Sequence, residues 1–330
     1  MPSQHKTYWH LKEARRVPSP YEIGTSRLLY HTDRGGFAVD LPTGEWYVRH
    51  QTGSPLLHPR WEEFEDPRAT TYGSYVRMQR EQEAYLARVF APTAVADGAG
   101  ALPADWLRIL DATFSPLRFV FHGFQMAAAY VGQMAPSGRI AVAALFQAAD
   151  EVRRIHGIAR RLGQLRDQLR GQPREQSPDF GADGRERWQS DPCWQPMRRA
   201  VETLLITYDW GEALVALNVC LKPMVDHLFT AEFAIGAERQ GDHADAQMLR
   251  SFADDCAWQR AWTMRLLLGR ATAGGDPVAR WVARWRPLAE EAAVAAAASL
   301  GASGPASAAR AAAAVVAWME PLKSERPDAG

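Results

Sequence analysis

The chain has 330 residues, 47% of them hydrophobic and 10% aromatic, so it is long and apolar enough to bury a sizeable core. Its 38 basic and 38 acidic residues leave no net charge, which argues against a dedicated nucleic-acid-binding protein, because such proteins usually carry a basic excess. The three cysteines are widely spaced and form no C-x-x-C pair. This indicates reduced thiols in a cytoplasmic protein and excludes a disulfide framework or a zinc site.

Residues 1–70 form a distinct N-terminal region in which aromatic side chains are scattered among proline, glycine and charged residues. A stretch this aromatic is not disordered by composition, yet it has little amphipathic pattern with which to build its own core. We therefore expect an extended, irregular arm that packs on something else. The sequence leaves open whether that is a partner or the chain's own helices; the candidate anchors are Trp9, Tyr21, Trp46 and Tyr47.

From residue 71 onward, apolar residues recur at helical spacing. Strand patterns are nearly absent outside the arm. The spacing predicts helices over 71–91, 104–114, 115–136, 137–171, 193–229 with a break near Pro223, 243–269, 276–301 and 307–322. Long helices joined by turns indicate an all-α bundle, so the sequence predicts a helical domain over residues 71–330 behind the arm.

One segment, residues 119–138, contains no charged side chain and is long enough to suggest a membrane span. However, His122, Gln125, Gln133 and Pro136 interrupt it, and the N-terminus lacks the apolar stretch of a signal peptide. We expect a buried core helix and no membrane segment.

Four of the apolar helices each contain one unexpected polar residue: Gln125, Glu151, Glu212 and Asp255. Four helices that each project such a group inward follow the plan of di-iron helix bundles, which also need a histidine three residues after two of the glutamates. Here Arg154 follows Glu151 at that spacing, Trp258 follows Asp255, and no Glu-x-x-His occurs anywhere. Arginine stays protonated and cannot ligate a cation. The sequence therefore predicts degenerate metal positions, with no catalytic residue and no metal ligand.

Two interpretations of Glu151 and Arg154 remain open from the sequence. The pair is either an exposed helical salt bridge, which contributes little to stability, or a buried one in which Arg154 replaces a metal ion. In the second case we expect Arg154 to pair with Glu151 and Glu212, while Arg153 lies on a neighbouring face and contributes little.

Several segments, taken in chain order, resemble a known family. They are residues 9–32, 116–140 (PLRFVFHGFQMAAAYVGQMAPSGRI), 146–161 (FQAADEVRRIHGIARR), 191–196 (DPCWQP), 209–223 (DWGEALVALNVCLKP) and 284–293 (RWRPLAEEAA). Together they resemble the beta subunit of bacterial multicomponent monooxygenase hydroxylases, in the toluene monooxygenase branch. The likeness covers most of the chain and weakens after about residue 295.

The resemblance implies a ferritin-like fold and a structural role. The chain would support a larger alpha subunit, which holds the di-iron centre and inserts oxygen from O2 into aromatic or alkene hydrocarbons such as toluene. A gamma subunit would complete the hydroxylase, usually as a dimer of three-chain units. An effector protein, a Rieske ferredoxin and a flavin reductase would serve this NADH-dependent enzyme in the cytoplasm. Glu151 with Arg154 would be a relic of a Glu-x-x-His pair, and the chain alone would be inactive and free of cofactor.

Two alternatives differ in class from a structural subunit. A self-sufficient ferritin-like metal-binding protein would need the Glu-x-x-His pairs that the sequence lacks. A helical nucleic-acid-binding module would use the basic surface of residues 158–175, but the neutral net charge speaks against it.

Overall fold

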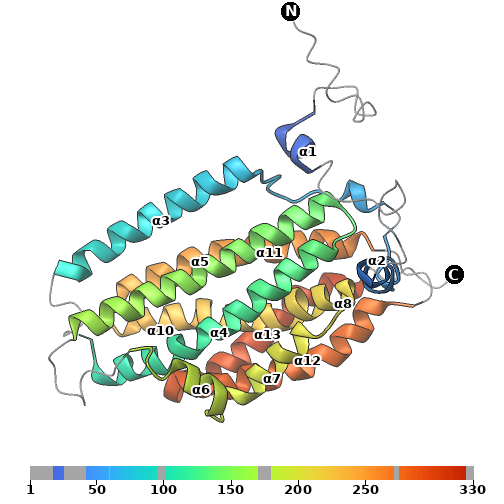
Figure 1. The fold of residues 1–330 in the computed structure, drawn as a ribbon. Coiled ribbons are helices and arrows are strands. Elements are labelled where there is room, and N and C mark those ends of the chain that lie inside the picture. Colours follow the sequence, from blue (N-terminus) through green and yellow to red (C-terminus); the bar gives the residue numbers. More distant parts are fainter. Residues whose placement is uncertain are drawn as a thin grey trace, which may run out of the picture.

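A computed structural model of the chain describes residues 18–25, 42–58, 60–95, 102–169, 180–270 and 275–324. Trp9 lies outside the described residues. Within these ranges the regular structure is helical (Figure 1), which confirms the all-α prediction.

The N-terminal region contributes short elements only: α1 (Pro20–Thr25), α2 (Pro42–Tyr47), the π-helical η4 (Val48–Thr52) and the 3-10 turn η5 (Trp61–Glu63). The bundle follows, with α3 (Tyr72–Val95), α4 (Ala104–Met134), α5 (Gly138–Gln168), α6 (Gly184–Ser190) and α7 (Gln195–Leu205). A long composite helix comes next: α8 (Trp210–Val215), η6 (Ala216–Leu221), α9 (Lys222–Asp226), η7 (His227–Glu232) and α10 (Phe233–Arg239). The chain then forms α11 (His243–Leu268), α12 (Pro277–Ala296), η8 (Ala297–Ser303) and α13 (Gly304–Ser324).

Helix α4 corrects the prediction of two separate helices over 104–114 and 115–136. It runs unbroken through Pro116, although proline lacks the backbone N–H that would bond to the preceding turn. Phe114 and Leu117, on either side of this position, are completely buried. Packing on both sides of the proline therefore holds the helix together despite the missing hydrogen bond.

The composite helix differs from the prediction in a similar way. The predicted helix over 193–229 is divided at residues 206–209 instead of at Pro223, and the second part continues to Arg239 through two π-helical turns, η6 and η7. By length and composition this segment could cross a membrane, but 94% of its most apolar window is buried inside the protein. It is the core helix of the bundle. Residues 119–138, which run from α4 through the turn to the start of α5, likewise lie mostly within the core.

The longest helices pack closely around this core. Helices α4 and α5 run side by side, and α11 lies behind α5 in Figure 1. Gly157 lets α5 approach α11, because a Cβ at this position would lie 2.7 Å from Cζ of Phe252. Four tryptophans are almost completely buried within the bundle: Trp194, Trp210, Trp262 and Trp285.

The described parts of the arm pack on the chain's own helices. Tyr21 is buried, and its hydroxyl accepts a hydrogen bond from the backbone N–H of Asp66 at 3.2 Å. Trp46 stays 38% exposed; its indole N–H donates to the hydroxyl of Tyr130 at 3.3 Å, and its ring meets Tyr208 edge-on. Tyr47 is partly buried against the core. The Tyr21 ring is thus buried by contacts within this chain, whereas part of the Trp46 ring is exposed to solvent.

Candidate functional site

Arg154 of α5 lies at the centre of a buried charge cluster in the middle of the bundle. Its side chain has no solvent exposure. One terminal nitrogen donates to Glu151 at 3.0 Å and to Asp226 at 2.8 Å, and the other donates to the hydroxyl of Thr230 at 3.1 Å. The guanidinium carbon lies 3.8 Å from the ring centroid of Phe121. These contacts come from α4, α5, α9 and η7 together, while Nε of Arg154 has no hydrogen-bond partner among the described residues.

Lys222 of α9 supplies a second buried cation. Its Nζ lies 2.6 Å from Glu151 Oε1 and 3.0 Å from Asp226 Oδ1. Each carboxylate thus faces both Lys222 and Arg154. Two fixed cations balance two carboxylates, so the buried cluster carries no net charge.

The pKa values follow from this balance. Burial alone lowers the pKa of the Arg154 guanidinium, but the attraction of Glu151 and Asp226 outweighs it and holds that pKa above its usual value. Burial likewise lowers the pKa of Lys222, and Asp226 and Glu151 more than offset this, so the net shift is upward. For Asp226, burial raises the pKa, but Lys222 and Arg154 bring it below its ordinary value. The two cations and Asp226 consequently stay charged across the physiological range.

The structure places the other sequence-predicted positions elsewhere. Glu212 was expected to pair with Arg154, but it accepts hydrogen bonds from Trp285 Nε1 at 2.9 Å and from Arg284 at 2.8 Å. Gln125 is half-buried on the outer side of α4. The expectation for Glu212 was wrong because Glu212 precedes Asp226, the residue that Arg154 contacts, by roughly 20 Å along the composite helix at the standard rise.

Asp226 and Lys222 are the members of the cluster that sequence reasoning missed. A signal for them was present: lysine occurs at only a few positions, and Lys222 stands within an apolar helix with Asp226 four residues later. Residues at that spacing are neighbours on a helix surface, so a buried lysine there predicts a buried acid as its partner.

Arg153 belongs to a second buried network, between α5, α3 and α11. The expectation that it would contribute little was wrong, because its side chain is only 7% exposed. It donates to Asp255 at 2.8 Å, to Glu83 at 2.9 Å and to the hydroxyl of Ser251 at 2.6 Å. Asp255, predicted as a degenerate metal position, is therefore the partner of Arg153 and lies outside the Arg154 cluster.

Asp150 is the second acid of this network, and its hydrogen-bond donors are neutral. It accepts from the Tyr75 hydroxyl at 2.7 Å, from Gln79 at 2.9 Å and from Gln259 at 2.9 Å. The amide of Gln79 also donates to Asp255 at 3.1 Å and so bridges the two carboxyl groups. Burial, and then the charge of Asp255, raise the pKa of Asp150 to about 8. Burial also raises the pKa of Asp255.

The Arg154 cluster does not fit a di-iron centre. Its two carboxylates, Glu151 and Asp226, already pair with a guanidinium and an ammonium group, and a divalent ion placed between them would meet two permanent positive charges. Among the residues that the structure describes, no group of three or more histidine, cysteine, aspartate and glutamate side chains is arranged to hold a metal ion. The donor set has cations where a metal would need nitrogen and free oxygen ligands.

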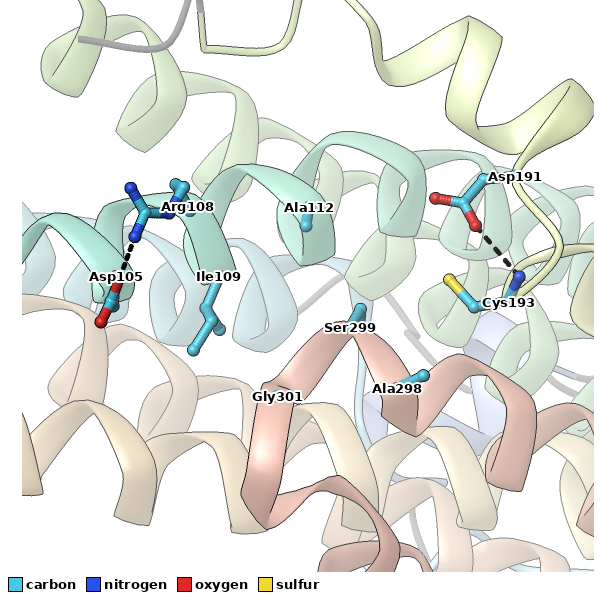
Figure 2. Close-up of a pocket in the computed structure, with 9 residues that line it drawn as sticks. All are labelled: Asp105, Arg108, Ile109, Ala112, Asp191, Cys193, Ala298, Ser299 and Gly301. Carbon is cyan, nitrogen blue, oxygen red and sulfur yellow. Dashed lines mark hydrogen bonds and ion pairs between the residues drawn. The ribbon is translucent and has the colours of Figure 1, made fainter. Parts of the chain in front are cut away.

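A groove of about 520 Å³ opens between α4, η8 and the turn before α7. Figure 2 shows Asp105 paired with Arg108 at one end and Asp191 accepting from the backbone N–H of Cys193 at the other. Among the described residues that line this groove the thiol is that of Cys193, and it is a poor nucleophile because burial and the neighbouring Asp191 raise its pKa to about 12. Burial raises the pKa of Cys220 and Cys256 to about 12 as well. The described lining of the groove therefore holds no arrangement of residues for nucleophilic catalysis.

The described residues form an all-helical bundle without a group of side chains arranged to hold a metal, which agrees with the ferritin-like fold that the sequence resemblance implied. The sequence profile of the methane/phenol/alkene hydroxylase family matches residues 46–269. This is more than half of the chain, and the chain therefore belongs to that family.

Two curated relatives show which subunit type the chain resembles. It is 32% identical, over 87% of its length and 88% of the relative's, to the hydroxylase component subunit beta of the toluene-4-monooxygenase system of Ectopseudomonas mendocina. It is 25% identical, over 75% of its length and 74% of the relative's, to the phenol 2-monooxygenase oxygenase component DmpL of Pseudomonas sp. (strain CF600). The resemblance to hydroxylase beta subunits of the toluene branch is thus confirmed.

Solved structures agree in fold. A chain of toluene 4-monooxygenase, from a crystal with toluene bound in the resting active site, superposes with a TM-score of 0.82 and 31% identity, covering 90% of this chain and 98% of that one. A chain of phenol hydroxylase from Pseudomonas sp. OX1 superposes with a TM-score of 0.78 at 19% identity, covering 93% and 91%. The second match, at this low identity, supports the fold alone.

Proposed function

We propose that this chain is the non-catalytic beta subunit of a di-iron hydroxylase that inserts oxygen from O2 into aromatic or alkene hydrocarbons. The observation that carries the proposal is the Arg154 cluster, in which a guanidinium and the Lys222 ammonium group neutralise Glu151 and Asp226. In this proposal Glu151 and Arg154 are the relic of a Glu-x-x-His pair. A larger alpha subunit supplies the di-iron centre and the chemistry.

The family resemblance extends the proposal to the rest of the complex. A gamma subunit completes a three-chain unit that pairs with a second one, and an effector protein, a Rieske ferredoxin and a flavin reductase make the enzyme NADH-dependent. The complex acts in the cytoplasm, in keeping with the free thiols of Cys193, Cys220 and Cys256. These partners and this location remain part of the proposal.

Iron analysis of the purified chain, alone and in the complex with its alpha subunit, tests the catalytic assignment. We expect no stoichiometric iron and no hydrocarbon oxidation from the chain alone, and iron and activity in the complex. Two irons per isolated chain together with activity would instead show a self-sufficient ferritin-like enzyme.

The arm is a second part of the proposal. We propose that residues 1–70 form a region apart from the helical domain of residues 71–330 and that the arm contacts the alpha subunit through Trp9, Trp46 and Tyr47. The partial exposure of Trp46 supports this, and buried aromatic anchors often dominate interface energies. Tyr21 is set aside as an anchor, because it is buried within this chain.

Deleting residues 2–50 tests the arm. We expect much less alpha subunit to co-purify with the shortened chain, while the helix content measured by circular dichroism stays nearly unchanged. A Tyr21→Phe variant of the full chain is the control, since it keeps the buried ring. Unchanged co-purification after the deletion would exclude the arm as an interface element.

A further inference from the structure

A buried pair of carboxyl groups lies where α10 meets α11, outside the networks of Arg153 and Arg154. The two groups belong to Asp242 and Asp245, whose side chains are 2% and 0% exposed. Neither residue takes part in the proposed function. A buried carboxylate is costly unless a cation or several donors compensate its charge, so this pair needs an explanation of its own.

The backbone turn between α10 and α11 directs both side chains inward. Gly241 lies in the left-handed region with a φ of +76°, and the N–H of Asp242 donates to the carbonyl of Ala237 at 2.9 Å, as at many helix ends. Asp242 then caps α11, because its carboxylate accepts the backbone N–H of Asp245 at 3.3 Å. In the common capping box the side chain at the position of Asp245 would bond to the N–H of Asp242, but here that N–H is already bonded. The Asp245 side chain therefore turns to α5 instead.

Arg161 of α5 is the cation that faces this pair. Its Nη2 donates to the two carboxyl oxygens of Asp242 at 3.1 and 3.3 Å, and its Nε donates to Oδ2 of Asp245 at 3.1 Å. From α4, Nε1 of Trp106 donates to Asp242 at 3.0 Å. Although Nε of Arg161 lies 2.9 Å from Oδ1 of Asp245, this oxygen has no hydrogen-bond partner among the described residues. One fixed cation thus faces two buried acids.

The other charged side chains on the helices around the pair lie at the surface. Those that form ion pairs are at least 37% exposed and pair with one another: Glu238 with His243 and Arg250, Arg160 with Glu83, and Arg108 with Asp105. Arg88 of α3 and Arg239 of α10 are exposed as well. The α3 side chain next to Arg161 is the uncharged ring of Phe90, with its centroid 5.7 Å from the guanidinium carbon. Within the described part of the chain, no second cation reaches the two acids.

Two carboxylates in contact cannot both stay ionised beside one arginine in a site without solvent. The carboxyl groups of Asp242 and Asp245 also hydrogen-bond to each other, and such a bond requires a proton on one of them. Burial raises the pKa of Asp245 well above its ordinary value; Arg161 opposes this rise and Asp242 adds to it. For Asp242, burial raises the pKa, but the bond with Asp245 and the charge of Arg161 bring it below its ordinary value. Asp245 is therefore the residue that carries the proton.

We propose that Asp242 and Asp245 share one bound proton and that this proton holds the start of α11 against α4 and α5. Asp245 donates it to Asp242, and Arg161 balances the single remaining negative charge. When the proton is lost, two carboxylates repel each other beside one cation, and the first turn of α11 separates from Arg161 and Trp106. The pair is thus a pH-sensitive contact at the end of the bundle where α4 and α11 begin, and it does not depend on the proposed function.

The direction of the pH effect follows from the bound proton. An aspartate of the unfolded chain has a pKa of about 3.9, so at neutral pH the folded chain holds a proton that the unfolded chain lacks. The stabilisation is fully present below about pH 3.9 and is lost as the pH rises through the raised pKa of Asp245 in the folded protein. While the proton is held, the unfolding equilibrium constant should increase by up to about ten-fold per pH unit.

The first test compares the purified full-length chain with Asp245→Asn, which keeps a hydrogen-bond donor to Asp242 without a titrating proton. The infrared difference spectrum of the two proteins at pH 7 should show the C=O stretching band of one protonated carboxyl group in the wild-type chain. Asp150 is present in both proteins, so its own band cancels. Asp254→Asn, at an exposed position of the same helix, is the matched control and should give no such band in its difference spectrum.

Hydrogen–deuterium exchange tests whether the proton holds the helix. As the pH rises above 7, the amides in the first two turns of α11 should lose protection in the wild-type chain by up to about ten-fold per pH unit, after correction for the intrinsic exchange rate. In Asp245→Asn the same amides should keep their protection over this range, because the variant has no proton to lose at this position.

Three results would overturn the proposal. The first is a difference spectrum without the band together with parallel exchange profiles, which would show that both acids are ionised. The second is a band without the loss of protection, which would show a bound proton that does not hold the helix. If Asp245→Asn fails to fold, Asp242→Asn takes its place: one acid then faces one cation, so the band should disappear, and its retention is the third contradicting result.

Discussion

Residues 150–154 of α5 contribute side chains to two buried networks, and the two networks differ in how their carboxyl groups are neutralised. Glu151 and Arg154 turn toward α9 and η7, where two carboxylates meet two fixed cations. Asp150 and Arg153 turn toward α3 and α11, where the donors to Asp150 are neutral side chains. Two pairs of residues, each three positions apart on the same helix, thus lie in two different electrostatic environments.

The difference teaches how a buried acid can be accommodated. In the Arg154 cluster, Lys222 and Arg154 hold the pKa of Asp226 below its ordinary value, so this carboxylate keeps its charge across the physiological range. Around Asp150, the pKa of about 8 means that a bound proton takes the place of a cation at neutral pH. We therefore expect the free energy of unfolding to fall when a charged side chain of the Arg154 cluster is removed. For the Asp150 network we expect it to depend on pH.

Loss of Arg154 should have the largest effect. Arg154→Ala leaves Lys222 alone with two buried carboxylates, and removing one partner of a buried ion pair costs about 3–5 kcal/mol. Urea unfolding of the variant and the wild-type chain measures the difference in free energy. The double variant Glu151→Leu with Arg154→Met keeps the Lys222–Asp226 pair and should recover much of the loss. A cost below about 0.5 kcal/mol for Arg154→Ala would make the pair equivalent to an exposed one.

Loss of Arg153 should have a smaller effect, of about 2 kcal/mol, because one of its acids, Glu83, is 46% exposed and can be solvated when the arginine is removed. Arg160→Ala is the matched control. Arg160 lies on the same helix, is 37% exposed and reaches Glu83 only at 3.8 Å, so its loss should cost less than about 0.5 kcal/mol. Equal costs at the two positions would remove the distinction between buried and exposed arginines on α5.

The pH response of the Asp150 network should be the smallest effect. The pKa of Asp150 is raised in the folded protein, to about 8, above an unfolded value of about 3.9. Its stabilising contribution is therefore fully present at low pH and is lost as the pH rises toward 8. From pH 6 to pH 7 the wild-type chain should lose up to about 1.4 kcal/mol relative to Asp150→Asn, since the variant cannot ionise there. Urea unfolding of both proteins at the two pH values checks this; parallel stabilities would show that Asp150 is ionised throughout.

The sequence predicted the bundle well because apolar spacing reports burial directly. It placed the long helices and the core character of residues 119–138, and it identified Glu151 with Arg154 as a position of interest. It erred at Pro116 and Pro223, where local preference predicts a break and packing of the surrounding core overrides it. The pairing of Arg154 with Asp226 could not be found by helical spacing alone, because the spacing within each helix does not show which positions of two different helices meet.

The expectation for Arg153 failed for another physical reason. Adjacent residues on a helix differ by about 100° in direction, so one of two neighbouring arginines usually reaches solvent. Here α5 is covered on one side by α4 and the composite helix and on another by α3 and α11, so both arginines are enclosed. Sequence periodicity shows which side of a helix is apolar, but it does not show how many helices surround it.

The two π-helical turns also affect how this chain can be compared with its relatives. A π-helical turn holds more residues than an α-helical one, so η6 and η7 each absorb extra length without a loop. A relative with one residue fewer between residues 216 and 221 would have an α-helical turn in place of the π-helical one, and the side chains on either side of it would keep their orientation. A single-residue gap in an alignment of this helix therefore marks members without the π-helical turn, in which the residues matching Lys222 and Asp226 still face the arginine.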